Sequence, residues 1–250
     1  MKRESVNKLL IVGFFAMAFG FVEGAVVVYI RKLFYNNVPL FPLRGFLDPS
    51  VLSVEFVREI ATIIMLVTIA MLAGKKAYER FAYFIYAFAI WDIFYYITLK
   101  WALDWPASLL TWDVLFLIPW TWIGPVLSPL LWCIAFISFT VLIIHFEDLG
   151  IKVNINWKEW SLMILGVLVC LFVWLYDFGK IIFGGGFARD FFGLKNNVEF
   201  AQIVSNYIPS YFNWPIFLFG LGISGAGFIL LYSRLKKLSL NKVKGKRKRA

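Results

Sequence analysis

The residues most able to do chemistry are the ionisable side chains that interrupt apolar segments of this chain. An ionised group inside a bilayer costs roughly 2.5–3.5 kcal/mol on insertion scales, so such a residue usually has a partner or a function. A carboxylate in a low-dielectric site tends to hold a proton unless a cation lies close, which suits proton coupling, cation binding or acid–base catalysis. The candidate ligand-binding residues chosen on this basis are Glu23, Arg58, Asp92, Tyr96, Lys100 and Asp113.

The spacing of these residues allows two interpretations. Tyr96 follows Asp92 by four residues and Lys100 follows it by eight, so all three lie on roughly one face of a helix. In the functional interpretation, the carboxylates line a polar site and Arg58 and Lys100 supply counter-charges. In the structural interpretation, pairs such as Glu23 with Arg58, or Asp92 with Lys100, only fix the register of packed helices. The sequence leaves both interpretations open.

The composition of the chain indicates which solvent surrounds these residues. Of its 250 residues, 61% are hydrophobic and only 16% are charged, whereas a soluble domain is nearer half apolar and a quarter charged. A protein in water needs a polar coat that this sequence cannot supply. We therefore predict one transmembrane domain over residues 1–235, followed by a basic cytoplasmic tail over 236–250.

The elements that must position the candidate residues are apolar helices. A spanning helix needs about 20 mostly apolar residues, and the expected spans are 9–30, 54–74, 81–101, 126–144, 160–183 and 214–232. This pattern predicts an all-α, polytopic bundle of about six helices. We interpret the first span as a retained helix and not as a cleaved signal peptide. Segment 109–118 is apolar but only half a span long, so we predict a re-entrant or interfacial half-helix there.

The distribution of basic residues predicts the orientation. Lys75, Lys76 and Arg80 follow the second span, and nine of the 25 basic residues lie between Arg234 and Arg249. Because cytoplasmic segments are enriched in Lys and Arg, both termini are expected in the cytoplasm, in a multi-pass protein of the cytoplasmic membrane. This orientation puts the candidate residues in the extracytoplasmic half, where we expect a polar pocket.

Other residue types restrict the cofactors and partners. Cys133 and Cys170 lie in apolar runs and His145 is the one histidine, so we expect no metal site, no haem and no other cofactor. The basic tail is predicted to contact anionic lipid headgroups, and no nucleic-acid binding is expected. A homo-oligomer or a partner in a larger membrane complex is compatible with the sequence.

Two stretches of the chain carry more specific motifs. The first is FVEGAVVVYIR at 21–31, and the second begins with WDIFYY at 91–96 and continues through WPASLLTWD at 105–113 and GPVLSP at 124–129. Together they resemble a family of uncharacterised prokaryotic multi-pass membrane proteins. The resemblance implies a prokaryotic membrane protein but no mechanism, and it falls on three of the carboxylates chosen above.

Three functions remain open from the sequence. The first is a small-solute or ion transporter, or a binding protein, coupled to protons or cations through a polar pocket in the extracytoplasmic half. The second is a membrane-embedded enzyme that acts on a lipid or isoprenoid substrate. The third is an accessory subunit of a larger membrane complex. Because no complete catalytic constellation is present, the sequence does not decide whether the protein is an enzyme.

Overall fold

The computed structural model describes residues 1–35, 40–43 and 49–247 of the chain. It confirms an all-α bundle, because six helices in the described residues are long and apolar enough to cross a membrane. The six are α1 (Arg3–Ile30), α2 (Pro49–Ala73), α3 (Ala77–Leu103), α4 (Leu127–Asp148), α5 (Trp157–Gly184) and α7 (Trp214–Arg247). The protein is therefore an integral membrane protein with several spans.

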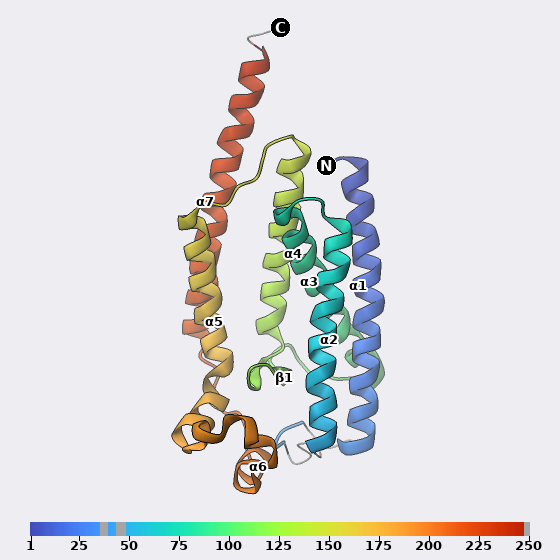
Figure 1. Cartoon of the computed structure of the whole chain (residues 1–250), viewed down its shortest axis with the longest axis vertical. Coiled ribbons are helices and arrows are strands. Elements are labelled where there is room, and N and C mark those ends of the chain that lie inside the picture. The colour runs from blue at the N-terminus through green and yellow to red at the C-terminus, as the bar shows by residue number, and fades with distance from the viewer. Residues whose placement is uncertain (36–39, 44–48, 248–250) are drawn as a thin grey trace.

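The helices form two packed units (Figure 1). In the first unit, α1, α2 and α4 pack around α3; in the second unit, α5 packs along α7. Glycines permit the closest contacts in both units, as in many membrane helix pairs. A Cβ at Gly20 on α1 would lie only 2.5 Å from the Trp91 carbonyl oxygen on α3, and a Cβ at Gly166 on α5 only 2.4 Å from the Gly220 carbonyl oxygen on α7.

The half-helix predicted for 109–118 is wrong, because this segment belongs to a two-stranded hairpin. Strand β1 (Trp112–Phe116) pairs antiparallel with β2 (Trp122–Pro125), with Asp113 opposite Gly124 and an irregularity after Val114. Aromatic and β-branched residues favour strands, and the prolines at 119 and 125 disfavour a continuous helix through this region. The antiparallel pairing satisfies part of the backbone hydrogen bonding of this segment.

Short helices cover the same end of the molecule as the hairpin. The 3-10 helix η2 (Phe187–Asn196) and the helix α6 (Val198–Ser205) lie in the segment between α5 and α7. Buried side chains of α6, Phe200 and Val204, pack with Phe178 and Ile182 of α5. Both chain termini lie at the opposite end of the bundle (Figure 1), as an even number of spans requires.

The last helix extends well beyond the other helices (Figure 1). Helix α7 continues past the predicted domain boundary at residue 235 and carries the described basic residues of the tail. It is held at this level by Lys242, whose Nζ donates hydrogen bonds to the carbonyl oxygens of Leu149 and Gly150 at 3.0 and 2.6 Å. The described part of the tail is therefore a helical continuation of the last span.

Candidate functional site

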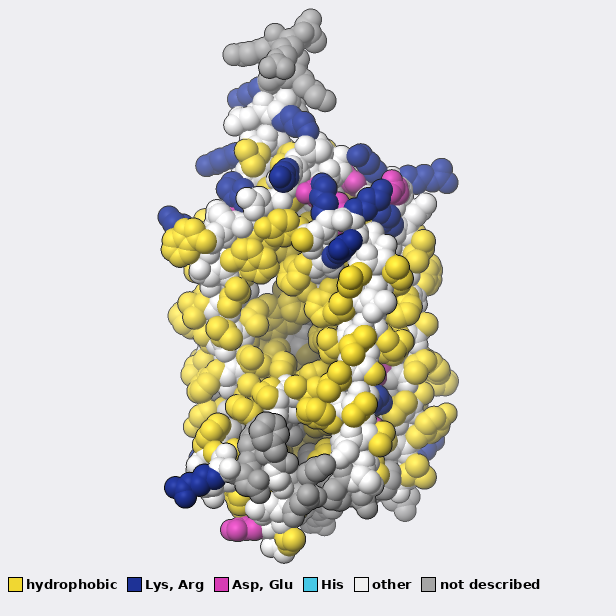
Figure 2. All heavy atoms as spheres, in the orientation of Figure 1, with side chains coloured by type: hydrophobic (Ala, Val, Ile, Leu, Met, Phe, Trp, Pro, Cys, Tyr) yellow, Lys and Arg dark blue, Asp and Glu magenta, His cyan; other side chains and the backbone are white. Residues whose placement is uncertain are grey.

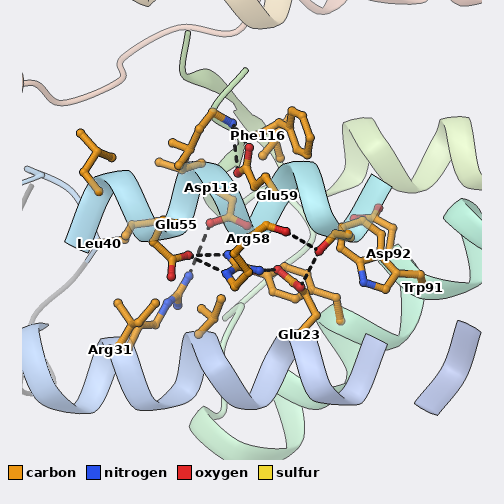
Figure 3. A pocket seen from close by; sticks show the side chains of 18 of the residues that line it. Glu23, Arg31, Leu40, Glu55, Arg58, Glu59, Trp91, Asp92, Asp113 and Phe116 are labelled. Atoms are coloured by element: carbon orange, nitrogen blue, oxygen red, sulfur yellow. Dashed lines mark hydrogen bonds and ion pairs between the residues drawn. The ribbon is translucent and has the colours of Figure 1, made fainter. Parts of the chain in front are cut away.

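A polar pocket lies between α1, α2, α3 and β1, towards the hairpin end of the bundle (Figure 3). Its volume is about 140 Å³. The C-terminal half of α1, the N-terminal half of α2 and the C-terminal half of α3 each contribute one or more charged residues to its wall. The pocket is therefore built where three spans and the hairpin meet, at the end away from both termini.

Arg58 of α2 forms the centre of the pocket's first ion cluster (Figure 3). Its guanidinium pairs with the Glu23 carboxylate of α1, and its Nε donates a hydrogen bond to Glu55 Oε2 at 2.9 Å. Thr62 Oγ1 donates a further, long hydrogen bond to Glu23 Oε2 at 3.4 Å. The pairing of Glu23 with Arg58 that the sequence suggested is confirmed, and it fixes α1 against α2.

A second ion cluster joins the end of α1 to the hairpin. Arg31 of the π-helical turn η1 (Arg31–Tyr35) approaches Asp113 Oδ1 of β1 at 3.4 Å, and Tyr96 of α3 donates its hydroxyl proton to Asp113 Oδ2 at 3.1 Å. The Arg31 guanidinium also lies 3.7 Å from the centre of the Trp105 ring. Asp113 is only 1% exposed, and burial raises its pKa to about 6 although Arg31 and Tyr96 oppose the rise.

Two further carboxylates line the pocket without a basic side chain in ion-pair contact. Glu59 of α2 accepts hydrogen bonds from the backbone N–H of Leu117 at 3.0 and 3.1 Å. Asp92 of α3 accepts one from the Cys133 thiol of α4, at 3.4 Å. Within the described part of the chain, neither carboxylate forms a salt bridge. A cationic group entering the pocket would therefore meet two carboxyl groups that no basic side chain already engages.

Lys100 lies outside the pocket. It is half exposed and pairs with Asp104 at 2.6 Å, and its Nζ also donates to the carbonyl oxygen of Pro106 at 3.2 Å. The expected pairing of Lys100 with Asp92 is therefore wrong. The eight-residue spacing does align the two residues on one helix, but two turns separate them along the axis, and the left-handed residue Asp104 brings a nearer carboxylate to Lys100.

The other five candidate residues lie in the pocket wall or directly behind it. Glu23, Arg58, Asp92 and Asp113 all line the pocket. Tyr96 does not line it but is buried behind it, where its hydroxyl orients the Asp113 carboxylate.

Several residues of the pocket wall lie outside the candidate set chosen from the sequence. Glu55 and Glu59 are one turn apart on α2 beside Arg58, and the sequence favoured structural ion pairs for them, but both line the pocket. Arg31 reaches the pocket only through the turn η1 after α1, for which the sequence carried no signal. Trp91 also lines the pocket; it is 7% exposed and its indole N–H has no hydrogen-bond partner among the described residues.

No protein-family model, curated protein or solved structure matches the chain. The geometry and chemistry of the pocket are therefore what indicates a function for this chain.

Proposed function

We propose that this integral membrane protein binds a small solute of net positive charge in the pocket between α1, α2, α3 and β1. The observation that carries the proposal is the presence of Glu59 and Asp92 in the pocket wall without a basic partner. Opposite charges interact more strongly in a site of low effective dielectric than in water. A bound cation would compensate these two carboxylates where the protein's own cations do not.

The charge balance of the whole pocket supports the same conclusion. Five carboxylates and two guanidinium groups line it. Each guanidinium is already engaged, Arg58 with Glu23 and Glu55 and Arg31 with Asp113. Glu59 and Asp92 are left without a basic partner, and carboxyl groups that can lose a proton when a cation binds favour a cation over an anion as the occupant.

The size and lining of the pocket restrict the cation. A volume of about 140 Å³ is below the ~300–1,000 Å³ of pockets for drug-sized ligands and suits a solute of a few heavy atoms. Trp91 and Tyr95 line the pocket and add aromatic rings, which attract cations. In the described residues, no group of three His, Cys, Asp or Glu side chains could hold a metal ion. We therefore favour a small organic ammonium or guanidinium compound.

Transport is the finer proposal that this site supports. In the orientation predicted from the basic residues, the pocket belongs to the extracytoplasmic half, where it would bind a solute arriving from outside. Carboxylates that exchange a proton for a cation would couple the two movements. Uptake of a radiolabelled amine into proteoliposomes, with and without a pH gradient, would test this step separately from binding.

Binding is tested with the purified full-length protein and a panel of methylammonium, guanidinium and choline. Isothermal titration calorimetry should detect at least one of these cations, and Glu59→Gln and Asp92→Asn should each abolish the signal. Both variants keep the volume of the side chain and should remain folded. Glu199→Gln, which alters an exposed carboxylate on α6, is the matched control. The proposal fails if no cation in the panel binds, or if both pocket variants bind as the wild type does.

A further inference from the structure

An apolar groove separates the two packed units and takes no part in the polar pocket. Its volume is about 650 Å³, and its walls come from α3 and α4 on one side and from α5 and α7 on the other. Figure 2 shows hydrophobic side chains around a hollow in the face of the bundle. The walls of the groove belong to four of the helices that are long and apolar enough to cross a membrane, so the bilayer is the nearest source of an occupant.

Contacts between the two units close the groove at both ends. Towards the end that carries the termini, the rings of Phe81 on α3 and Trp160 on α5 are 5.7 Å apart, and both line the groove. Towards the hairpin end, the indole N–H of Trp174 on α5 donates a hydrogen bond to Ser128 Oγ on α4 at 2.8 Å, and Trp174 stacks on Trp122. The groove is therefore a compartment of limited length.

The walls offer an occupant no free hydroxyl group. Ser138 Oγ donates its hydrogen bond to the carbonyl oxygen of Ile134, and Ser224 Oγ donates to that of Met163. Almost all other wall residues are aliphatic or aromatic. The occupant that such walls accept is a hydrocarbon.

The length of the groove distinguishes between two apolar occupants, a spanning helix of a partner protein and a lipid acyl chain. On α4 the wall runs from Leu131 to Phe139, which is about 12 Å at 1.5 Å per residue. A spanning helix of a partner protein needs about 30 Å of hydrophobic length, so it cannot lie between the two closed ends. We propose that the groove binds a segment of one acyl chain of a membrane phospholipid, inserted from the side between α4 and the pair formed by α5 and α7.

The test uses the full-length protein in nanodiscs that contain a phosphatidylcholine with a diazirine in one acyl chain. After irradiation, peptide mass spectrometry should find more label on groove residues of α4 and α5, such as Ala135 and Val167, than on the outward face of α2. The outward face is represented by Ile64 and Leu72, which are exposed on that helix. Equal labelling of both places would overturn the proposal.

Two glycines of α7 supply matched variants. A Cβ at Gly225, which lines the groove, meets no heavy atom within 4 Å, and the same is true at Gly222, which is exposed and does not line it. Gly225→Trp should reduce labelling of the groove walls severalfold, whereas Gly222→Trp should leave it unchanged. Because both changes replace glycine by the same residue on one helix, their effects on helix propensity are equal.

Gly225→Leu introduces a smaller side chain and is included in case Gly225→Trp prevents folding. Gly225→Leu should give an intermediate loss of label, with a thermal transition like that of Gly222→Trp. Unchanged labelling in a folded Gly225→Leu and Gly225→Trp would contradict the proposal. Native mass spectrometry would show whether the wild type forms a dimer. If the Gly225 variants lose a dimer that the wild type forms, with no change in labelling, the proposal is contradicted and the groove is assigned to a second copy of the chain.

Discussion

The polar pocket and the apolar groove are both spaces between helices of one bundle, but they are bounded in different ways. The pocket is about 140 Å³ and the groove about 650 Å³. Around the pocket, ion pairs join α1 to α2 and η1 to the hairpin. Along the groove, the facing side chains are apolar and are as compatible with lipid as with each other. Specific polar contacts therefore draw together the helices around the pocket. No such contact joins the facing walls of the groove between its two closed ends.

This difference predicts that the pocket region depends on single residues more than the groove region does. Arg58 is largely buried and serves two carboxylates. Removal of one partner from a buried ion pair leaves an uncompensated charge, which is more costly than the loss of any one apolar contact.

Arg58→Met should have the largest effect on stability. It leaves Glu23 and Glu55 without their cation, and the expected loss is about 3–5 kcal/mol, as for other buried pairs from which one partner is removed. Unfolding of the detergent-solubilised protein by a denaturing detergent would measure it. The combined variant Glu23→Gln, Glu55→Gln, Arg58→Met should recover much of the loss. A loss below about 1 kcal/mol in the single variant would show that Arg58 contributes no more to stability than a surface ion pair does.

The pH dependence of stability should reveal Asp113. Burial raises the pKa of this group from 3.8 to about 6 in the folded protein. Between these values the unfolded chain is ionised while the folded chain keeps its proton, so stability should fall as pH rises from about 4 to about 6, by up to about 3 kcal/mol. The same titration of Asp113→Asn should show a smaller fall, because the contribution of Asp113 is removed while the other buried carboxylates of the pocket keep theirs. An identical slope in both proteins would contradict the assignment.

Close helix packing should be affected next, and in both units. Gly20→Ala and Gly166→Ala each place a Cβ within 2.5 Å of a facing carbonyl oxygen, so each should cost about 1–3 kcal/mol by forcing helices apart. Gly222→Ala meets open space and should be neutral or slightly stabilising, because alanine favours the helix. Thermal unfolding of the three variants would compare them. Equal stability of all three would mean that the helices separate without cost.

The smallest effect is expected at Lys100. Its pair with Asp104 is exposed, so Lys100→Met should change the free energy of unfolding by less than about 1 kcal/mol. Cation binding measured by calorimetry should be unchanged, because Lys100 does not line the pocket. Loss of binding in this variant would reinstate the counter-charge role that the sequence suggested.

The spans were predictable because hydropathy is a property of each segment alone. All six expected ranges fall on observed helices, although the helices extend several residues further at one or both ends. The hairpin was not predictable in the same way. A short apolar run such as 109–118 is compatible with either a strand or a helix, and the choice depends on pairing with residues after Trp120 that lie outside the run.

The sequence predicted which residues belong to the candidate site better than it predicted their contacts. Glu23, Arg58, Asp92 and Asp113 were recognised because a charge in an apolar segment needs a reason, and all four line one pocket. The partner of each was harder to predict. Asp113 is served by Arg31 and Tyr96, and Lys100 by Asp104, since partner choice depends on how helices are rotated and where they end.

Hydropathy along the chain is enough to predict that the protein lies in a membrane, where its spans fall and which ionisable residues interrupt them. These properties follow from the transfer of each segment from water to lipid, which needs no knowledge of its neighbours. Packing in three dimensions was needed to show that Glu59 and Asp92 lack a basic partner, that β1 lines the pocket, and that a groove runs between α4 and the pair formed by α5 and α7. Those features depend on distances between segments far apart in the chain, and only packed helices bring such segments within hydrogen-bonding range.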